Sequence, residues 1–227
     1  MVDAHRHGIL LLLGATLAWS TSGLFARAIP LDTPTVILWR GLAGAAGLFL
    51  TLWWLKGAEG FRDFRRLGWA GWAYSLSSGL GMLLFVGSLK ATSIAHVAII
   101  YATLPFVAAF LGWWLLKEPP GRAGILAAAL ALVGAMVMVG LGGDGTLIGD
   151  LMAFGMVLAM AALILIARGT PETPTLAAGT LSAVLAPLAM LPFASLAGLD
   201  APNLLLMAGF GLINSTLGFA LFVLGSR

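Results

Sequence analysis

The sequence predicts an all-α polytopic membrane protein, and three observations lead to this fold class. First, the 227 residues are 60% hydrophobic and 9% charged, with a mean hydropathy of +1.03, whereas a soluble domain is about 25% charged. Second, long apolar runs recur along the chain between short stretches rich in Gly, Pro and Asp. Third, the basic residues gather in alternate stretches between these runs. A chain of this composition cannot cover its surface with polar groups, so we expect lipid to be its main solvent.

The spans follow from length, because a membrane-spanning helix needs roughly 20 mainly apolar residues. The breaks between the apolar runs carry turn chemistry, as in IPLDTP and KEPPGR. The first run has no small-residue cleavage site after it, so we interpret it as a retained span. The sequence thus gives eight candidate spans, at about 8–28, 34–55, 68–89, 93–116, 122–140, 148–167, 175–197 and 203–226.

The distribution of the basic residues predicts the orientation of the chain in the membrane. With the N-terminus inside, nine of the 12 basic residues lie on the cytoplasmic side, whereas only Arg27 and Lys90 lie outside and Arg40 falls within the second span. This excess predicts a cytoplasmic N-terminus. It also explains the formal charge of +3 without nucleic-acid binding, which we do not expect. The chain has no cysteine, so disulfides and thiolate metal sites are excluded.

Self-comparison predicts an internal repeat. FARAIPLDTPT (25–35) is echoed by IARGTPETPT (166–175), and SGLGMLLFV (78–86) by STLGFALFV (215–223). The two matches occur in the same order, at offsets of 166 − 25 = 141 and 215 − 78 = 137 residues. We therefore expect a first repeat at 1–144, with spans 1–5, and a second at 145–227, with spans 6–8.

Five spans is an odd number, so the second repeat would enter the membrane inverted, as in many secondary transporters. Counterparts of residues 91–140 would follow residue 227. We therefore expect that the chain is truncated after span 8 of a ten-span protein, which consists of two inverted five-helix repeats.

Several motifs resemble those of a known family. They are LAWSTSGLFAR in span 1, TPTVILWRGLAGA in span 2, GSLKATSIAHVAIIYATLPFVAAFLGWWLLKEPP across spans 3 and 4, and GDLMAFGMVLAM in span 6. The chain resembles the EamA-type branch of the drug/metabolite transporter superfamily, and within it the bacterial exporters of aromatic and other amino acids. The resemblance covers essentially the whole chain.

The resemblance implies a multi-pass protein of the bacterial inner membrane that exports amino acids or related small metabolites by alternating access. Its partners would be a small-molecule substrate and the lipid bilayer, with a monomer favoured and no cofactor. The alternatives are transport of another metabolite or a drug with proton coupling, and a membrane-embedded enzyme. The enzyme is disfavoured because the sequence lacks G-x-S-x-G, H-E-x-x-H and paired intramembrane aspartates.

Pro105 marks a predicted kink in span 4. Proline lacks an N–H, and its ring crowds the carbonyl of the residue four before it, which is Tyr101. A freed carbonyl in hydrocarbon needs a partner. We expect Pro105 and Tyr101 to border the transport cavity, and a packing kink between helices is the alternative. His96 and Thr103, seven residues apart, share one helix face; His96 is either a substrate or proton contact or an interfacial residue.

Arg40 is the only strongly charged residue within an apolar span and away from its ends. Intramembrane arginines usually face protein or water, and the guanidinium fork suits a substrate carboxylate. The alternative is an arginine that reaches outward along its span. Asp32 is a plausible partner for it.

Small polar residues lie at matching depths in the two predicted repeats. Trp19 and Ser22 lie in the middle of span 1, and Asn214 and Ser215 in span 8 align with the region of Ser78 in span 3. We expect these residues to line a cavity, with hydrogen-bonded helix packing as the alternative. No Asp or Glu lies near the centre of a span, and no Walker A motif is present. Facilitated, gradient-following export without a bound metal is therefore the expected mechanism.

Overall fold

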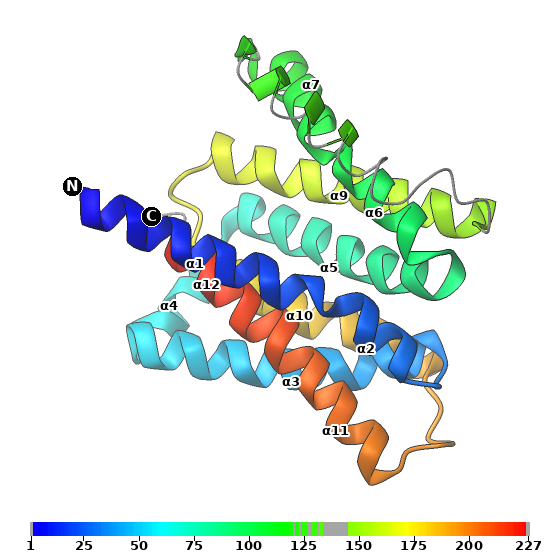
Figure 1. The fold of residues 1–227 in the computed structure, drawn as a ribbon. Helices are drawn as coiled ribbons and strands as arrows, with labels where there is room; N and C mark the ends of the chain where they lie inside the picture. The colour runs from blue at the N-terminus through cyan, green and yellow to red at the C-terminus, as the bar shows by residue number, and fades with distance from the viewer. Residues whose placement is uncertain are drawn as a thin grey trace. The chain divides into compact units, whose positions relative to one another are not determined.

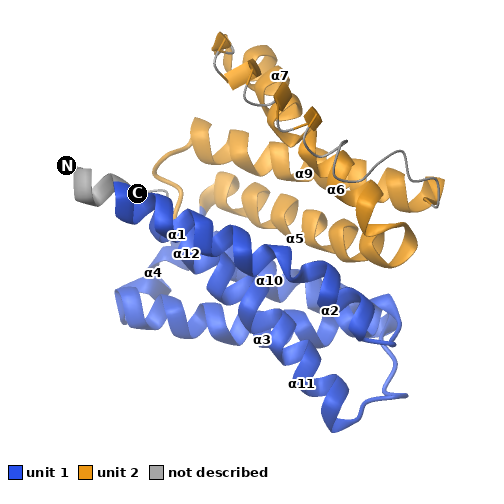
Figure 2. Ribbon diagram, in the orientation of Figure 1, with its two compact units in different colours: residues 1–67, 176–227 blue, residues 68–175 orange. Residues whose placement is uncertain are grey.

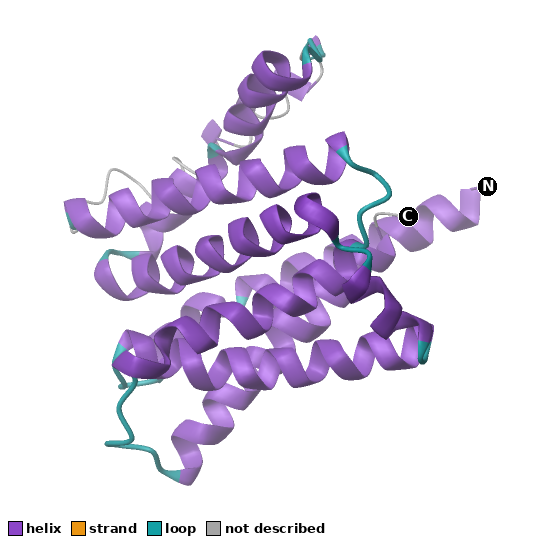
Figure 3. Cartoon of the chain, turned by 180° about the vertical axis from the view of Figure 1, so that it is seen from behind, coloured by secondary structure: helices purple, strands orange, loops and turns teal. Residues whose placement is uncertain are grey.

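The computed structural model describes residues 2–119, 121–122, 124–126, 129–130, 132–133 and 145–225. Within these ranges the regular elements are helices, and no strand is found (Figure 3). The predicted all-α polytopic class is confirmed by seven described helical stretches long and apolar enough to cross a bilayer. The one remaining predicted span, span 5 at 122–140, lies mostly outside the described residues. The seven stretches are Arg6–Ala28, Thr33–Lys56, Gly68–Ala91, Ile94–Leu116, Leu147–Gly169, Thr175–Phe193 and Ala201–Gly225.

The chain divides into two compact units (Figure 2), of which unit 1 comprises residues 1–67 and 176–227. It contains spans from both ends of the chain. Its helices are α1 (Val2–Ser20), α2 (Ser22–Ala28), α3 (Thr33–Lys56), α4 (Glu59–Arg65), α10 (Thr175–Met190), η1 (Leu191–Phe193), α11 (Ala201–Phe210), η2 (Gly211–Gly218) and α12 (Phe219–Gly225). The first residue of α10, Thr175, is also the last residue of unit 2.

Unit 2 comprises residues 68–175. Its described helices are α5 (Gly68–Ala91), α6 (Ile94–Ala102), α7 (Leu104–Leu116) and α9 (Leu147–Gly169). The α5 and α9 helices lie side by side, and α6 and α7 pack against α9 (Figure 1). Glycines allow close contact between α5 and α9: a Cβ on Gly87 would lie 3.1 Å from Met152 Sδ, and one on Gly155 would lie 3.0 Å from Leu84 Cδ1.

Two helix starts in unit 1 follow the turn residues of the sequence. Before α3, Asp32 Oδ2 accepts a hydrogen bond from the Thr35 N–H at 3.0 Å, and Pro34 occupies the first turn. Before α11, Asp200 Oδ1 accepts from the Asn203 N–H at 2.9 Å. These caps satisfy backbone donors that have no partner within the helix.

The glycine-lined face of α3 organises unit 1. A Cβ on Gly44 would lie 2.7 Å from Ser215 Cβ, and one on Gly47 would overlap the side chain of Thr216. Thr216 Oγ1 also donates to the Gly44 carbonyl at 3.2 Å. Small residues of this kind let helix backbones approach closely. As a result, η2 lies directly on α3.

Two helix pairings join spans that the predicted repeat relates to one another. In unit 1, span 1 packs on span 8, through α1 with η2 and α12. In unit 2, span 6 packs on span 3, through α9 with α5. Under the repeat, span 1 corresponds to span 6 and span 8 to span 3. Each unit thus combines spans from both sides of residue 144, and the repeat boundary itself stays a prediction.

Candidate functional site

Span 1 is interrupted where a run of hydroxyl residues follows Trp19. The α1 helix ends at Ser20, a turn lies at Thr21, and α2 begins at the next residue. Thr21 Oγ1 donates to the Ala18 carbonyl at 2.7 Å, and Ser22 Oγ donates to the Trp19 carbonyl at 2.5 Å. Hydroxyl bonds to backbone carbonyls three residues earlier compete with the helical hydrogen bonds and bend a helix. The interruption is therefore encoded locally.

Asn214 in η2 binds this interruption from the other side. Its side chain is 5% exposed. Its Nδ2 donates to the Ala18 carbonyl at 3.0 Å and to Thr21 Oγ1 at 3.4 Å. Its Oδ1 lies 2.9 Å from Ser22 Oγ and shares the single hydroxyl hydrogen of Ser22 with the Trp19 carbonyl. The main-chain oxygen of Asn214 accepts from Trp19 Nε1 at 3.1 Å. The side-chain oxygen and nitrogen of Asn214 thus both have partners.

The element that carries Asn214 is a π-helix, in which hydrogen bonds run from residue i to i+5. Such segments are rare and occur often at functional sites. Gly218 at its end approaches the Trp19 ring so closely that a Cβ would lie 2.8 Å from Cδ1. Two irregular helices, span 1 and span 8, therefore meet at their irregular points.

Arg40 lies on α3 beside the same π-helix and is only 4% exposed. Its Nη2 donates to Ser215 Oγ at 3.3 Å, and its guanidinium carbon lies 4.2 Å from the centre of the Phe210 ring. The ring face attracts a cation. Within the described part of the chain, the buried Nε and Nη1 of Arg40 have no hydrogen-bond partner. Arg40 thus holds a buried charge with two unused donor nitrogens.

The expected pairing of Arg40 with Asp32 is not formed. Asp32 Oδ2 instead accepts from the backbone N–H and the hydroxyl of Thr35, at 3.0 and 2.8 Å. This carboxylate caps its own helix, which fixes it at the helix end. Arg40 takes part in none of the ion pairs found among the described residues, which are Lys56–Asp63, His96–Asp150 and Arg168–Glu118.

The structure divides the predicted site residues between the two units. Trp19, Ser22, Arg40, Asn214 and Ser215 come together in unit 1, and we call them the polar centre of unit 1. Ser78 is partly buried on α5 in unit 2. The remaining residues, His96, Tyr101, Thr103 and Pro105, lie on α6, on α7 or at the junction between them.

The predicted kink at Pro105 is present. The α6 helix ends at Ala102, and α7 begins at Leu104 with Pro105 in its first turn. Thr103 Oγ1 donates to the Ile100 carbonyl at 2.6 Å and so reinforces the bend. Pro105 also lines a pocket of about 240 Å³ whose other lining residues are Phe106, Ala109, Phe110, Trp113, Gly124 and Ile125. These side chains provide no hydrogen-bonding group except the Trp113 ring nitrogen, so the pocket has little means to orient a polar substrate.

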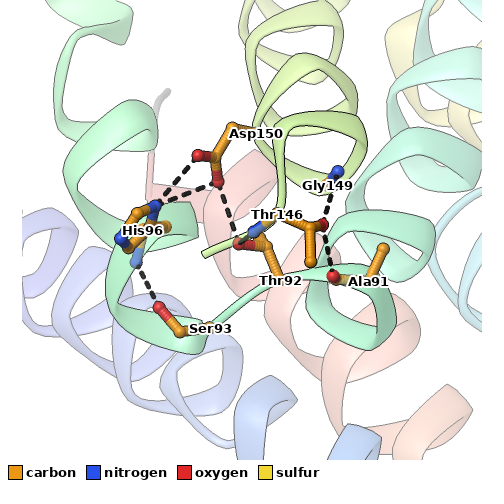
Figure 4. Close-up of polar contacts among 7 residues, drawn as sticks. All are labelled: Ala91, Thr92, Ser93, His96, Thr146, Gly149 and Asp150. Carbon is orange, nitrogen blue, oxygen red and sulfur yellow. Dashed lines mark hydrogen bonds and ion pairs between the residues drawn. The ribbon is translucent and has the colours of Figure 1, made fainter. Parts of the chain in front are cut away.

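His96 contacts an acidic residue whose involvement the sequence analysis missed. Its Nδ1 lies 3.0 and 3.1 Å from the two carboxylate oxygens of Asp150, at the start of α9 (Figure 4). Thr92 Oγ1 donates to Asp150 Oδ1 at 2.9 Å. Both partners of the pair are partly exposed, at 26% and 29% for their side chains. A signal was available, because Asp150 and His96 both fall in the first turn of an apolar helix, yet their separation of 54 residues hid the contact.

Interrupted helices that cross at a polar centre within a polytopic helical fold are typical of secondary transporters. The comparisons with known proteins agree with this class. The chain belongs to the EamA-like transporter family, whose family model matches residues 6–140. This family lies in the drug/metabolite transporter superfamily, so the chain is a member of a family of membrane transporters.

The fold is shared with a solved structure whose description reads only "Crystal structure of protein". The TM-score is 0.74 at 18% sequence identity, and the match covers 96% of this chain and 78% of the other. An identity this low demonstrates a common fold and nothing about substrate. The comparison with curated proteins gives no match.

Proposed function

We propose that this protein is a secondary transporter that exports amino acids or related small metabolites across the bacterial inner membrane. The polar centre of unit 1 binds the substrate, and the carrier works by alternating access, with flux following the substrate gradient. It functions as a monomer in the bilayer. Members of the family are transporters, and we propose no catalytic reaction, metal or cofactor.

The observation that carries this proposal is the buried guanidinium of Arg40. Its Nε and Nη1 have no protein partner in the described chain, and no described carboxylate balances its charge. An unpaired charge within a span is costly and by default suggests function. A carboxylate that accepts from Nη1 or from Nε would supply a missing bond and the missing charge. An amino acid carries such a group.

The other residues of the polar centre have a supporting role in this proposal. Asn214 uses its amide to hold span 1, and Trp19 uses its ring nitrogen to hold η2. Ser215 binds Arg40 Nη2 and so orients the guanidinium. Arg40 is accordingly the residue that contacts the substrate, whereas Asn214 and Trp19 fix the helices around it.

Proton-coupled transport of another metabolite or a drug is the alternative mechanism. It requires a group that binds protons and is open to water. The partly exposed His96–Asp150 pair is such a group, and for this reason the alternative is retained.

The test measures substrate binding and transport together. Purified protein is reconstituted in proteoliposomes loaded with an unlabelled amino acid, and counterflow of the labelled amino acid is measured over an aromatic and aliphatic panel. Thermal stabilisation of the detergent-solubilised protein by the same amino acids reports binding alone. We expect both signals with the amino acid and neither with its carboxamide, which lacks the negative charge.

Variants assign the effect to Arg40. Arg40→Gln should weaken binding about tenfold or more, because charge-assisted bonds contribute about 1.5–3 kcal/mol. Arg40→Lys should fall between Gln and the native residue, since it keeps the charge and loses the fork. Arg27→Gln is the matched control, because Arg27 is exposed on α2. Equal binding of acid and carboxamide, or an unchanged Arg40→Gln, would refute the proposed site.

A further inference from the structure

The short helix α4 packs against the last turns of α3 in unit 1 (Figure 1). A Cβ on Gly60 would lie 2.9 Å from Leu52 Cγ, so the two helices are in close contact. Lys56 Nζ also donates to Asp63 Oδ2 at 2.5 Å, which joins the helices by an ion pair. The α3 helix is long and apolar enough to cross a bilayer, and it ends at Lys56. We therefore expect α4 to lie where the membrane meets water, on the cytoplasmic side by the predicted orientation.

Aromatic rings occupy the contact between α3 and α4. Phe64 of α4 stacks on Phe49 of α3, with ring centres 5.8 Å apart, and Phe61 meets Trp53 edge to face at 5.8 Å. Phe61 is nevertheless 45% exposed, and Trp53 and Trp54 at the end of α3 are 57% and 82% exposed. Tryptophan is enriched at the interface between lipid and water. These exposed rings therefore suit a helix at that level of the membrane.

Three arginines occupy the opposite side of α4. Arg62, Arg65 and Arg66 are three and four residues apart, which places them on one helix face, and all three are exposed. Phe64, which contacts α3, points the other way, because each residue turns a helix by about 100°. Within the described residues none of the three arginines forms an ion pair. Glu59 is the acidic residue on this face, so three positive charges and one negative charge give it a net charge of +2.

We propose that this arginine face of α4, formed by Glu59, Arg62, Arg65 and Arg66, binds the headgroups of anionic phospholipids. Guanidinium forks match the oxygens of a phosphate group. A helix with basic residues on one face and aromatic rings on the other is typical of segments that lie in the membrane interface. Anionic lipids attract basic segments next to a span. The rings beside the arginines contact the apolar part of the same lipid, which a soluble phosphate lacks.

The experiment measures thermal stabilisation of the full chain in a neutral detergent. Short-chain phosphatidylglycerol should raise Tm, because a ligand that binds the folded state stabilises it. Phosphatidylcholine of the same chain length has no net charge and should have little effect. The shift with phosphatidylglycerol should shrink as the salt concentration rises, since salt screens exposed charges. Glycerol phosphate supplies the phosphate without acyl chains and should not raise Tm. An equal shift with phosphatidylcholine or with glycerol phosphate would overturn the proposal.

A triple variant assigns the effect to α4. Arg62→Gln, Arg65→Gln and Arg66→Gln together should weaken the apparent affinity for phosphatidylglycerol by about tenfold or more, since each arginine near an anionic surface contributes about fivefold. The matched control removes three other exposed basic residues of the predicted cytoplasmic side, by Arg6→Gln, Lys117→Gln and Arg122→Gln. It should keep the native affinity. An equal loss in both triple variants would mean that the overall charge of the protein, rather than α4, attracts the lipid.

A variant that strengthens binding covers the case in which the triple variant fails to fold. Glu59→Gln removes the negative charge from the arginine face and keeps the three arginines, so it should raise the affinity for phosphatidylglycerol severalfold. Asp63→Asn is the contrasting change, because the Asp63 carboxylate is paired with Lys56 and lies on the side of α4 toward α3. It should have a smaller effect on lipid affinity than Glu59→Gln. An unchanged or weaker affinity in Glu59→Gln would contradict the proposed surface.

Discussion

The main-chain oxygen of Asn214 accepts a hydrogen bond from Trp19 Nε1 at 3.1 Å, and this bond joins the π-helix of span 8 to the interruption in span 1. The contact is reciprocal, because Asn214 Nδ2 donates to the carbonyl of Ala18, next to Trp19. Each helix therefore provides a side-chain donor for a backbone carbonyl at the irregular point of the other helix. Buried backbone groups in a membrane need such partners, because no water is present to bind them.

Replacing Asn214 by leucine tests this joint. The change keeps the side-chain size and removes the bonds to Ala18, Thr21 and Ser22. We expect a loss of about 1–2 kcal/mol in the free energy of unfolding, in line with interhelical hydrogen bonds in membranes, and a lower Tm in detergent. Asn203→Leu is the control, since the hydrogen bond from the Asn203 side-chain amide to the Gly198 carbonyl is exposed. Equal Tm changes for the two variants would contradict the assigned role.

Gly47→Ala tests the close approach of η2 to α3. An added Cβ would lie 2.7 Å from Thr216 Cγ2 and 2.9 Å from Thr216 Cβ, so the two helices must separate. Overpacking of this kind costs about 1–3 kcal/mol, and we expect a fall in Tm. Gly121→Ala adds the same methyl group where no atom lies within 4 Å, and its Tm should stay near the native value.

The bend between α6 and α7 has two local causes, and they are separable. Pro105→Ala should restore a backbone donor, while Thr103 Oγ1 still competes for the Ile100 carbonyl at 2.6 Å. We therefore expect partial straightening in Pro105→Ala and more in the double variant with Thr103→Ala. The chain has no cysteine, so spin labels at positions 98 and 110 report their separation by electron resonance. The label separation should increase toward that of a straight helix, about 18 Å along its axis for 12 residues.

An unchanged label separation in the double variant would mean that packing against α9, rather than these two residues, sets the bend. Labels at 76 and 88 on α5, which is an uninterrupted helix, provide a reference for a straight segment of the same length. Their separation should be the same in all variants.

The spans and their approximate limits follow from the sequence because apolar length and turn residues determine them. Asp32 illustrates this: its position before Thr-Pro-Thr marks the start of α3, and it caps that helix. The same residue shows where sequence reasoning failed. Its carboxylate caps the helix by accepting hydrogen bonds from Thr35. Although Asp32 is close to Arg40 in sequence, the two do not form an ion pair.

The site was less predictable than the spans because its contacts join distant residues. Asn214 and Ser22 are separated by 192 positions, and each could have a local role within its own helix. Their hydrogen bond could therefore be recognised only once the fold was known. The hydroxyls after Trp19 were visible as small polar groups, but their effect on the backbone depends on carbonyls within the same helix. Likewise, Asp150 lies at a helix end, and only the packing of α6 on α9 brings it to His96.

The π-helix also affects whether span 8 can lose one residue and keep its buried face. A π-helical stretch holds a surplus residue relative to an α-helix, while each residue of an α-helix turns it by about 100°. Deletion of Leu212, which is 47% exposed within η2, should let the segment wind as an α-helix and leave α11 and α12 with their present faces. Deletion of Leu80, 51% exposed on the regular helix α5, should turn the rest of that helix by about 100° away from α9. Comparing expression and Tm of the two deletions will show whether span 8 can change its length by one residue and keep its buried face.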